Sequence, residues 1–334
     1  MINLKIIHEF SPALPTTEIR GELYLTRHRS NPIIRPMQTY DLCLTWYWLY
    51  DHDFIRYTGE ACSAQGITLW QITPTNVLQA VTELYTGFTT FNCLLDRAND
   101  DLRFEPIRRF AQKNHLQCIN APELSHWSED KATMHLELMQ AGLQTPYTIL
   151  ISPFIDQPLL PPLNITPLGV NFVLKPAVGG GGEGVRMNAS SLDDIQRARL
   201  EFPDQKYLAQ ENIIACLISG REAWFRIFYV GGACIPCWWN PTNHVYSVLT
   251  PDEETQFELT ALRSITQRIA RVCKLDWFST EIALTPGGRF VVVDYVNDGI
   301  DTRIQSKATD GIPDEVMKLM AEALVTLVVR ETRV

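Results

Sequence analysis

The sequence predicts an α/β protein of mixed, α+β character, and three observations support this. Residues 1–125 alternate short apolar runs with helical patterns, which is typical of an α/β unit. Farther along, a strand pattern ends at Lys175 and continues at once into five glycines and one glutamate. Beyond residue 213, pairs of apolar runs flank glycine turns and alternate with helical patterns, as in hairpins packed against helices.

The first 125 residues contain two clear strand patterns, at 66–72 and 91–97, whereas the aromatic stretch 44–50 is ambiguous. A well-marked helix then opens near Ser128, which we expect to be its N-cap. Gly142 fits the position just after the helix, and Pro146 prevents its continuation.

The remaining elements follow from the same signals of alternation, periodicity and capping. Ser190 or Ser191 can cap a short helix, Gly231-Gly232 predicts a hairpin turn, and Pro313 suits the first position of the last helix. We expect strands at 170–175, 185–187, 206–211, 222–230, 278–284 and 289–295, and helices at 191–200, 254–273 and from Pro313 onward.

Composition excludes several classes of partner. The formal net charge of −9 argues against nonspecific binding to nucleic acid or to an anionic membrane. The segment Met1–Ile7 does not look like a signal peptide, and no apolar run reaches transmembrane length. The eight cysteines, including the lone pair Cys234 and Cys237, indicate reduced core residues rather than a zinc or redox site. We therefore expect a cytoplasmic protein with neither nucleic-acid nor membrane partners.

The glycine loop is the strongest chemical signal. Gly179, Gly181 and Gly184 satisfy G-x-G-x-x-G, but a strand follows where a dinucleotide fold needs a helix, and no P-loop motif is present. Exposed backbone N–H groups beside Lys175 suit phosphate oxygens. The pattern predicts a loop between two antiparallel strands that covers a nucleoside triphosphate.

Five segments in order resemble the ATP-grasp family. Lys131 lies in an E-D-K-A-T run followed by A-G-L-Q-T-P, and Val173–Pro176 leads into the glycine loop. Residues 208–213 resemble the hinge that holds adenine, 221–232 the next strand and turn, and 281–297 the metal-binding strands. The resemblance spans about residues 85–330. It implies an ATP-grasp fold behind a pre-ATP-grasp α/β domain, with domains at 1–125, 126–212 and 213–334.

The resemblance also implies roles for individual residues. Lys131 and Lys175 would neutralise phosphate charge, and Glu222 would accept hydrogen bonds from the ribose hydroxyls or be merely an exposed strand residue. Arg226 pairs with a phosphate or simply with a core acid, and Arg303 or Arg186 supplies a further cation. The nucleotide would contact Gly180, Gly181, Gly182, Gly184, Gln210, Glu211, Asn212 and Ile213, and Mg²⁺ would contact Glu281, Asp294 and Asn297.

One departure from the family concerns the last metal strand. The family commonly has Glu-x-Asn there, whereas this chain has Asp294-Tyr295-Val296-Asn297, one residue longer. Strand alternation then turns Asn297 to the wrong face unless a β-bulge intervenes.

The sequence thus predicts a carboxylate–amine ligase that uses Mg-ATP and forms an amide through an acyl phosphate. The substrates would be a small carboxylate and an amine, such as an amino acid or peptide, and dimerisation is implied only by analogy. Two alternatives stay open: a small-molecule kinase on the same scaffold, and a nucleotide-binding regulatory protein without turnover.

Overall fold

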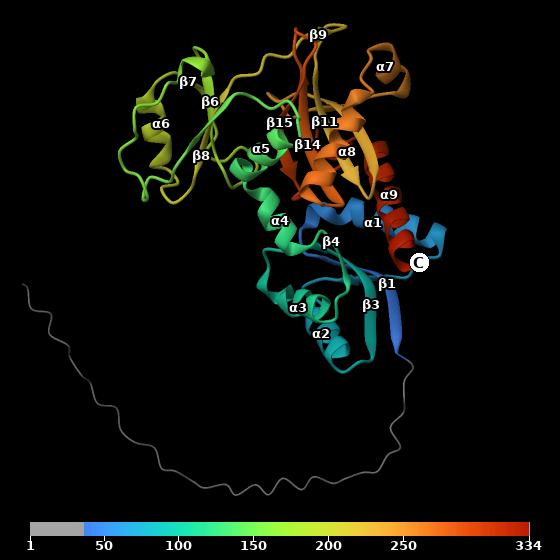
Figure 1. The fold of residues 1–334 in the computed structure, drawn as a ribbon. Coiled ribbons are helices and arrows are strands. Elements are labelled where there is room, and N and C mark those ends of the chain that lie inside the picture. The colour runs from blue at the N-terminus through green and yellow to red at the C-terminus, as the bar shows by residue number, and fades with distance from the viewer. Residues whose placement is uncertain (1–36, 334) are drawn as a thin grey trace, which may run out of the picture. The chain divides into compact units, whose positions relative to one another are not determined.

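The computed structural model describes residues 37–333, which contain three sheets of four or five strands and one two-stranded ribbon (Figure 1). The predicted first domain, 1–125, is therefore described only from residue 37, and the segment Met1–Ile7 lies outside the described residues. Residues 37–333 belong to one unit of the chain. The boundaries at 125/126 and 212/213 stay predictions.

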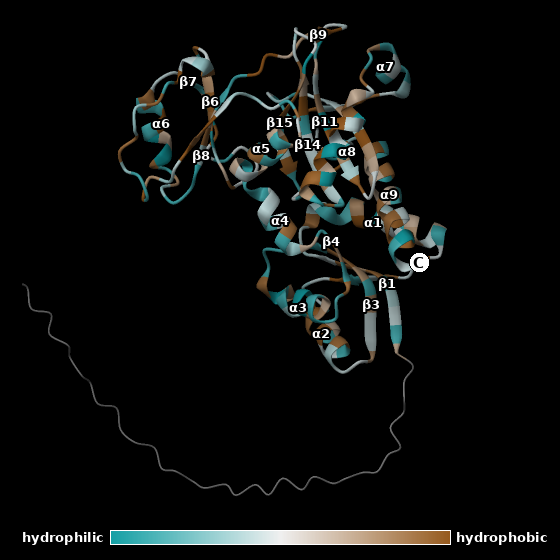
Figure 2. Ribbon diagram, viewed as in Figure 1, coloured by the Kyte–Doolittle hydropathy of each residue, from teal (hydrophilic) through white to brown (hydrophobic). Residues whose placement is uncertain are grey.

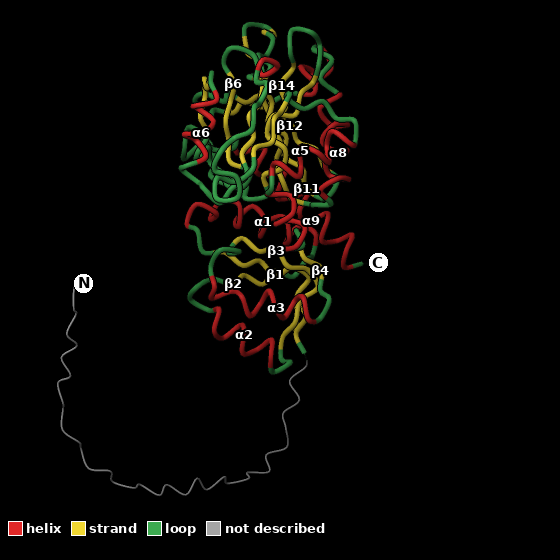
Figure 3. The backbone as a smooth tube through the Cα atoms, turned by 60° about the vertical axis from the view of Figure 1, so that its left-hand side comes forward, coloured by secondary structure: helices red, strands yellow, loops and turns green. Residues whose placement is uncertain are grey.

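The first sheet is entirely parallel, in the order β2-β1-β3-β4. Alternation along β1 sends Leu42 and Leu44 toward α1 and Cys43 toward α2 and α3. The helices accordingly lie on both faces of the sheet (Figure 3). The elements are β1 (Gln38–Trp46), α1 (His52–Gln65), β2 (Leu69–Ile72), α2 (Val77–Tyr85), β3 (Thr89–Arg97), α3 (Glu105–Lys113) and β4 (Gln117–Ile119).

The ambiguous stretch 44–50 comprises the end of β1 and the beginning of a 3₁₀ turn, Leu49–Asp51. Asn120, just after β4, docks the parallel sheet onto β14. Its amide nitrogen donates to the carbonyl of Trp277 at 2.7 Å, and its amide oxygen accepts from the N–H groups of Asp276 and Trp277. Asn120, Asp276 and Trp277 are all buried or half-buried, so their hydrogen bonds fix the end of the parallel sheet.

Two consecutive helices, α4 (Pro122–Glu129) and α5 (Lys131–Gln140), follow the parallel sheet. The prediction that Ser128 caps the second helix is wrong, because Ser128 lies in the last turn of α4 and donates to the carbonyl of Ser125. Asp130 is the cap instead, and its carboxylate accepts from the N–H groups of Ala132 and Thr133. The helix ends before Gly142 as predicted.

The small sheet has the order β5-β8-β6-β7 and is antiparallel. Its helix, α6 (Leu192–Arg199), begins with a capping box formed by Ser191 and Asp194. Arg199 is fully buried and donates to the carbonyls of Ser152, Pro153 and Gln157, which ties the following loop to the sheet. The elements are β5 (Thr148–Ile151), a 3₁₀ turn (Thr166–Leu168), β6 (Phe172–Pro176), β7 (Arg186–Ala189) and β8 (Tyr207–Glu211).

The large sheet is antiparallel, in the order β13-β12-β11-β14-β15. Along β11, Phe225 and Ile227 face the cluster containing α8, whereas Phe228 and Val230 face α9 and α1. The ribbon consists of β9 (Leu217–Ile218) and β10 (Arg221–Glu222). The sheet comprises β11 (Trp224–Val230), β12 (Ala233–Trp239), β13 (Tyr246–Val248), β14 (Trp277–Leu284) and β15 (Phe290–Asn297).

The single helix predicted over 254–273 is wrong, because the structure has α7 (Pro251–Gln256) and α8 (Ala261–Cys273). Thr250 forms a capping box with Glu253, so the first helix starts earlier than predicted. The chain then breaks at Glu258, which has a φ of 56°. This break accompanies an ion pair in which the guanidinium of the exposed Arg263 donates to both oxygens of the buried Glu254 carboxylate, at 2.7 and 2.8 Å.

The last helix, α9 (Asp314–Thr332), packs against α1 and the large sheet. Pro313 is its N-cap and not its first residue, so the predicted start is one position early. Both hydrophobic and hydrophilic segments appear along α8 and α9 in Figure 2, as expected for helices that bury one face.

All eight cysteines lie in the described residues, and none forms a disulfide. Burial raises the pKa of the Cys234 thiol to about 11, so this member of the C-x-x-C pair is a poor nucleophile, in line with a structural role. Between residues 37 and 333, no helix has the length and apolarity that crossing a bilayer requires.

Gly231, in the turn between β11 and β12, tests how tightly α9 is packed. Its φ is 53°, and an added Cβ would lie 2.7 Å from the Cβ of Leu327. We expect Gly231→Ala to lower the free energy of unfolding by about 1–4 kcal/mol, because it adds backbone strain and overpacks α9. The measurement is urea unfolding. Gly287→Ala is the control, since that glycine has no positive φ and only one atom within 4 Å; equal losses in both variants would contradict the packing argument.

Candidate functional site

The hairpin of β14 and β15 brings two carboxylates together. Glu281 lies directly opposite Asp294, and Ser279 lies opposite Asn297. Two steps along β14 therefore correspond to three steps along β15, which is a β-bulge. The bulge takes up the extra residue of β15. Asn297 therefore lies opposite Ser279, which is two positions from Glu281 along β14. The bulge that the sequence required for Asn297 is present.

Arg226 on the neighbouring strand β11 completes the acidic hairpin. It is in register with Glu281, and its guanidinium donates to Glu281 Oε1 at 3.0 Å and to Ser279 Oγ at 3.2 Å. Burial raises the pKa of Glu281; Arg226 opposes this increase, and Asp294 adds to it. The guanidinium also lies 5.2 Å from the ring centre of Trp239, whose buried indole N–H has no hydrogen-bond partner among the described residues.

Lys175 extends from the small sheet to the large sheet. It lies on β6, is 7% exposed, and its ammonium donates to the carbonyl of Val293 on β15 at 3.0 Å. Burial lowers its pKa to about 8; the charges of Asp294 and Glu281 oppose that decrease, whereas Lys131 reinforces it. The lysine and the two acids, predicted to share one site, are thus close enough to perturb one another.

Lys131 joins the same group from the first turn of α5. Its main-chain N–H donates to the carbonyl of Ala177 at 2.8 Å, and its ammonium donates to the carbonyl of Gly179 at 2.5 Å. The helix therefore holds the start of the glycine loop. Asp130, the cap of this helix, forms an ion pair with Lys206, just before β8.

The glycine loop connects two antiparallel strands, β6 and β7, as the sequence predicted. Gly180, Gly181 and Gly182 have open space where a side chain would be. Gly184 is different: its φ is 70°, and an added Cβ would lie 2.6 Å from the ring of Phe202. The loop is thus anchored at Gly184 and exposed in its middle, which leaves backbone N–H groups accessible to an anion.

The predicted adenine hinge divides into two parts. Gln210 and Glu211 end the central strand β8, and the N–H of Glu211 donates to the carbonyl of Tyr147. The Glu211 carboxylate accepts from the N–H of Tyr147 at 3.0 Å. Asn212 and Ile213 follow outside the strand, and their N–H groups make no backbone hydrogen bond within the described residues. Only these last two residues keep donors available for a base.

A buried polar chain lies behind these residues, and sequence reasoning missed it. The amide nitrogen of Gln210 donates to the Tyr295 hydroxyl at 2.7 Å and to Thr148 Oγ1 at 2.9 Å. The Tyr295 hydroxyl lies 2.7 Å from Nδ1 of His135 on α5. That hydroxyl has one hydrogen to donate and two lone pairs, so it accepts from Gln210 and either donates to His135 or accepts from it, according to the imidazole tautomer. The ammonium of Lys175 lies 5.2 Å from the ring centre of Tyr295.

Two predicted residues are not brought into this group by any contact within residues 37–333. Glu222 is exposed on β10, paired with Leu217. Arg303 forms hydrogen-bonded ion pairs with Asp301 and Asp310, the second with both oxygens. Burial lowers the pKa of Arg226, but nearby ionisable groups raise it overall, and Asp301 is one of them. The loop that carries Arg303 therefore adjoins the site.

The donor set fits a hard divalent cation bridged to phosphates. Within the described residues, no group of three or more His, Cys, Asp and Glu side chains could hold a metal alone. Glu281, Asp294 and Asn297 offer two carboxylates and one amide oxygen, and oxygen ligands with an incomplete shell suit Mg²⁺ that also binds a nucleotide. The indole N–H of Trp239 lies near enough to Glu281 to oppose the increase in the pKa of that acid, although it makes no hydrogen bond of normal geometry within residues 37–333.

Comparison with known proteins supports this fold. No family model matches the sequence, and no curated protein matches it. A RimK domain ATP-grasp protein from Sphaerobacter thermophilus matches with a TM-score of 0.56 and 19% identity over 86% of this chain and 99% of its own. The ATP-grasp ligase PsnB, complexed with a minimal precursor, Mg and ADP, matches at 0.57 and 14% over 86% and 98%.

D-alanine–D-alanine ligase from Bacillus anthracis, complexed with ATP, matches with a TM-score of 0.55 and 13% identity over 88% of this chain and 97% of its own. These likenesses extend across most of each chain. This protein therefore has the ATP-grasp fold, as the ordered sequence segments predicted.

The neutral His135 makes stability depend on pH. Burial lowers its pKa to about 4, and the charge of Lys175 adds to this, whereas the unfolded chain takes up the proton near pH 6.5. The unfolded state binds more protons between these values, so stability is full above pH 6.5 and falls as the pH drops toward 4. We expect His135→Gln to reduce this loss by roughly 3 kcal/mol.

The measurement is urea unfolding of both proteins at several values between pH 7 and pH 4. His126→Gln, which removes an exposed histidine from α4, is the control and should keep the wild-type dependence. Identical pH slopes for wild type and His135→Gln would show that the imidazole is not held neutral.

Proposed function

We propose that this protein is an ATP-dependent carboxylate–amine ligase that forms an amide through an acyl phosphate. The observation that carries the proposal is the burial of Lys175, from the small sheet, against the Glu281–Asp294 hairpin of the large sheet. A phosphate group is the natural partner for a lysine, a glycine loop and a Mg²⁺-binding acid pair that lie together.

The ATP-grasp neighbours support this choice of substrates. By their names, one is a D-alanine–D-alanine ligase complexed with ATP, and another is a ligase complexed with a precursor peptide. Identities of 13% and 12% carry the fold alone, so an amino-acid or peptide substrate for this chain is part of our proposal.

The reaction would proceed in two steps. A substrate carboxylate oxygen attacks the γ-phosphorus of ATP, and the bond to the β-phosphate oxygen breaks, which gives an acyl phosphate and ADP. The amine nitrogen then attacks the acyl carbon. As the carbon–nitrogen bond forms, the carbon–oxygen bond breaks, phosphate leaves with the electron pair, and the nitrogen loses a proton.

The chain's own residues would chiefly position groups and neutralise charge. Lys131 and Lys175 would bind phosphate oxygens, the loop 179–184 would cover them, and Asn212 and Ile213 would offer main-chain donors to the base. Arg226 keeps Glu281 oriented through its 3.0 Å ion pair and would also face the transferred phosphate. When bound by Glu281, Asp294 and Asn297, Mg²⁺ would neutralise charge on the phosphate oxygens.

Water must be kept from an acyl phosphate, because hydrolysis would waste it. The exposed glycine loop and the small sheet that carries it are suited to cover the nucleotide. Lys131 already links α5 to this loop through Gly179.

The absence of disulfides agrees with the proposed cytoplasmic location.

The proposal predicts that ADP and phosphate are released only when Mg-ATP, a carboxylate and an amine are all present. Lys175→Ala and Glu281→Gln should each lower this rate by about 100-fold or more, as expected when a group that neutralises transition-state charge is removed. Lys318→Ala, on α9, is the control and should retain wild-type turnover. The measurement is coupled detection of ADP across panels of acids and amines.

Other outcomes would identify the alternatives. A stable phosphorylated product formed without an amine indicates a kinase. Tight ATP binding without ADP release across the panels indicates a regulatory nucleotide-binding protein. Full turnover in a Lys175→Ala/Glu281→Ala double variant would refute the assignment of the site.

A further inference from the structure

A second site candidate is a cavity of about 970 Å³ at the carboxyl ends of β1, β3 and β4. It lies between the parallel sheet and α4, and its wall includes Glu129 and residues 298–300. Crevices outside the carboxyl ends of parallel strands are common ligand sites, and this volume suits a ligand larger than one amino acid. Glu129 is two residues before Lys131, and Asp298 follows Asn297, so the cavity adjoins the proposed phosphate site.

The floor of this cavity contains buried polar atoms that the described residues leave unpartnered. They are Asp51 Oδ2, Arg97 Nε and Trp277 Nε1, all from residues that line the cavity. Asp51 itself is 0% exposed, and its other oxygen accepts from Arg97 at 2.6 Å and from Thr302. Each of these atoms exposes less than 1 Å² of surface, so an unpaired group there costs about 1–3 kcal/mol unless an enclosed water or a small movement of the wall supplies a partner.

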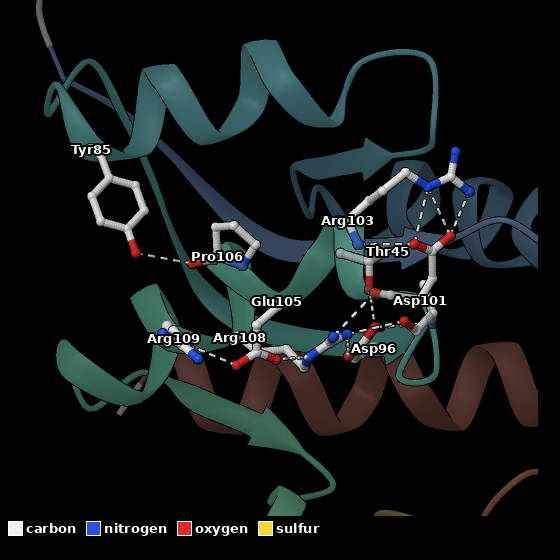
Figure 4. A network of polar contacts seen from close by, with 10 residues as sticks. Thr45, Tyr85, Asp96, Asp101, Arg103, Glu105, Pro106, Arg108 and Arg109 are labelled. Atoms are coloured by element: carbon white, nitrogen blue, oxygen red, sulfur yellow. Dashed lines mark hydrogen bonds and ion pairs between the residues drawn. The ribbon is translucent and has the colours of Figure 1, made fainter. Parts of the chain in front are cut away.

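The arginines around the cavity are already paired. Arg97 donates to Asp51 and to the carbonyl of Ile300. Arg108 divides its guanidinium between Asp96 and Glu105, at 3.0 Å each, and Arg109 donates to Glu105 at 2.8 Å (Figure 4). Arg97 and Arg108 are therefore engaged by internal partners, whereas Arg109 uses only its Nε and is mostly exposed.

Several acids of the cavity wall have no such partner. Glu123, Glu129 and Asp298 make no ion pair within residues 37–333, and Glu129 and Asp298 accept no hydrogen bond there either. The pKa of Glu129 is raised by burial first and by the charge of Asp298 second, so the two carboxylates are near one another. His126, which also lines the cavity, and Lys131 oppose this increase in pKa, but the acids of the wall outnumber its arginines, so its net charge is negative.

Aromatic rings line the cavity together with these acids. Tyr47 and Trp48, just after β1, line the cavity and are 37% and 38% exposed. The Tyr47 hydroxyl donates to Asp100, another carboxylate of the wall, at 2.8 Å. Exposed aromatic faces beside carboxylates bind organic ammonium ions, because ring faces and carboxylates both attract a cation. Large exposed apolar side chains also favour an apolar body on the ligand.

We propose that this cavity binds an organic ammonium cation with an apolar body, which is the amine co-substrate, with Glu129 and Asp298 facing the ammonium group. The proposal rests on the ligase function proposed above and specifies its amine. The ammonium group would first lose a proton to one of these two carboxylates. The neutral nitrogen, which then has a lone pair, would attack the acyl carbon of the acyl phosphate, because Glu129 and Asp298 are close in sequence to Lys131 and Asn297.

Binding can be tested without nucleotide by saturation-transfer NMR on the full chain. The probes are phenethylamine, its neutral isostere 2-phenylethanol, and the anion 3-phenylpropionate. We expect phenethylamine to bind at least about tenfold more tightly than the other two, since a tenfold ratio needs only one modest charge interaction. Equal binding of the three probes, or a preference for the anion, overturns the proposal.

Two variants locate the site. Glu129→Gln and Asp298→Asn should each weaken phenethylamine binding by about tenfold or less, the usual range for one partly exposed charge. The charge-matched control Asp252→Asn/Glu322→Gln changes two exposed carboxylates elsewhere that have no ion pair in residues 37–333 and should bind as wild type does. If one site variant does not fold, the other decides. Wild-type affinity in every folded site variant overturns the assignment.

A parallel measurement separates this proposal from the ligase function. Binding of a fluorescent ATP analogue and release of ADP test the function alone. Amine binding without ADP release would refute the ligase while supporting the cavity. ADP release that depends on an amine, with no preference for phenethylamine over its isosteres, would refute the cavity while supporting the ligase.

Discussion

The hydroxyl of Tyr295 joins three elements on which the site depends. It accepts from Gln210 of β8 and is hydrogen-bonded to His135 of α5, while its own strand β15 carries Asp294 and Asn297. The small sheet, the helix of Lys131 and the acidic hairpin are therefore held in register by one buried group. Burial makes such a network costly to leave incomplete, so its bonds fix the relative positions of these elements.

The sequence predicted the order of the elements and the residues that bear charge because these signals are local. Alternation revealed β3, β6 and β14, and the glycines marked the loop before Gly184 and the turn at Gly231. The bulge before Asn297 was required by strand alternation and is present. The grouping of Lys175 with Glu281 followed only from a resemblance, since residues over one hundred positions apart carry no local signal of contact.

Other features depended on tertiary contacts that the sequence does not display. The break between α7 and α8 accompanies the pairing of Glu254 with Arg263, which periodicity cannot reveal. Asp130 replaced Ser128 as a cap because α4 extends to Glu129. The cavity beyond β1 and β4 is lined by segments that are far apart in the sequence, and of its acids only Glu129 lies in a motif, where the pattern drew attention to Lys131. A histidine on a helix, such as His135, likewise reveals its partner only after folding.

The contacts of Tyr147 and Glu211 have a mechanical consequence. The small sheet begins at Thr148 and ends at Glu211. Tyr147, just before the sheet, exchanges two hydrogen bonds with Glu211, so the chain enters and leaves the sheet at one place. Arg199 ties the loop after β5 to the same sheet, so strands and loop form one piece. Any movement of this piece away from β15 would first have to break the hydrogen bond between Gln210 and Tyr295, and it would carry Lys175 and the glycine loop together.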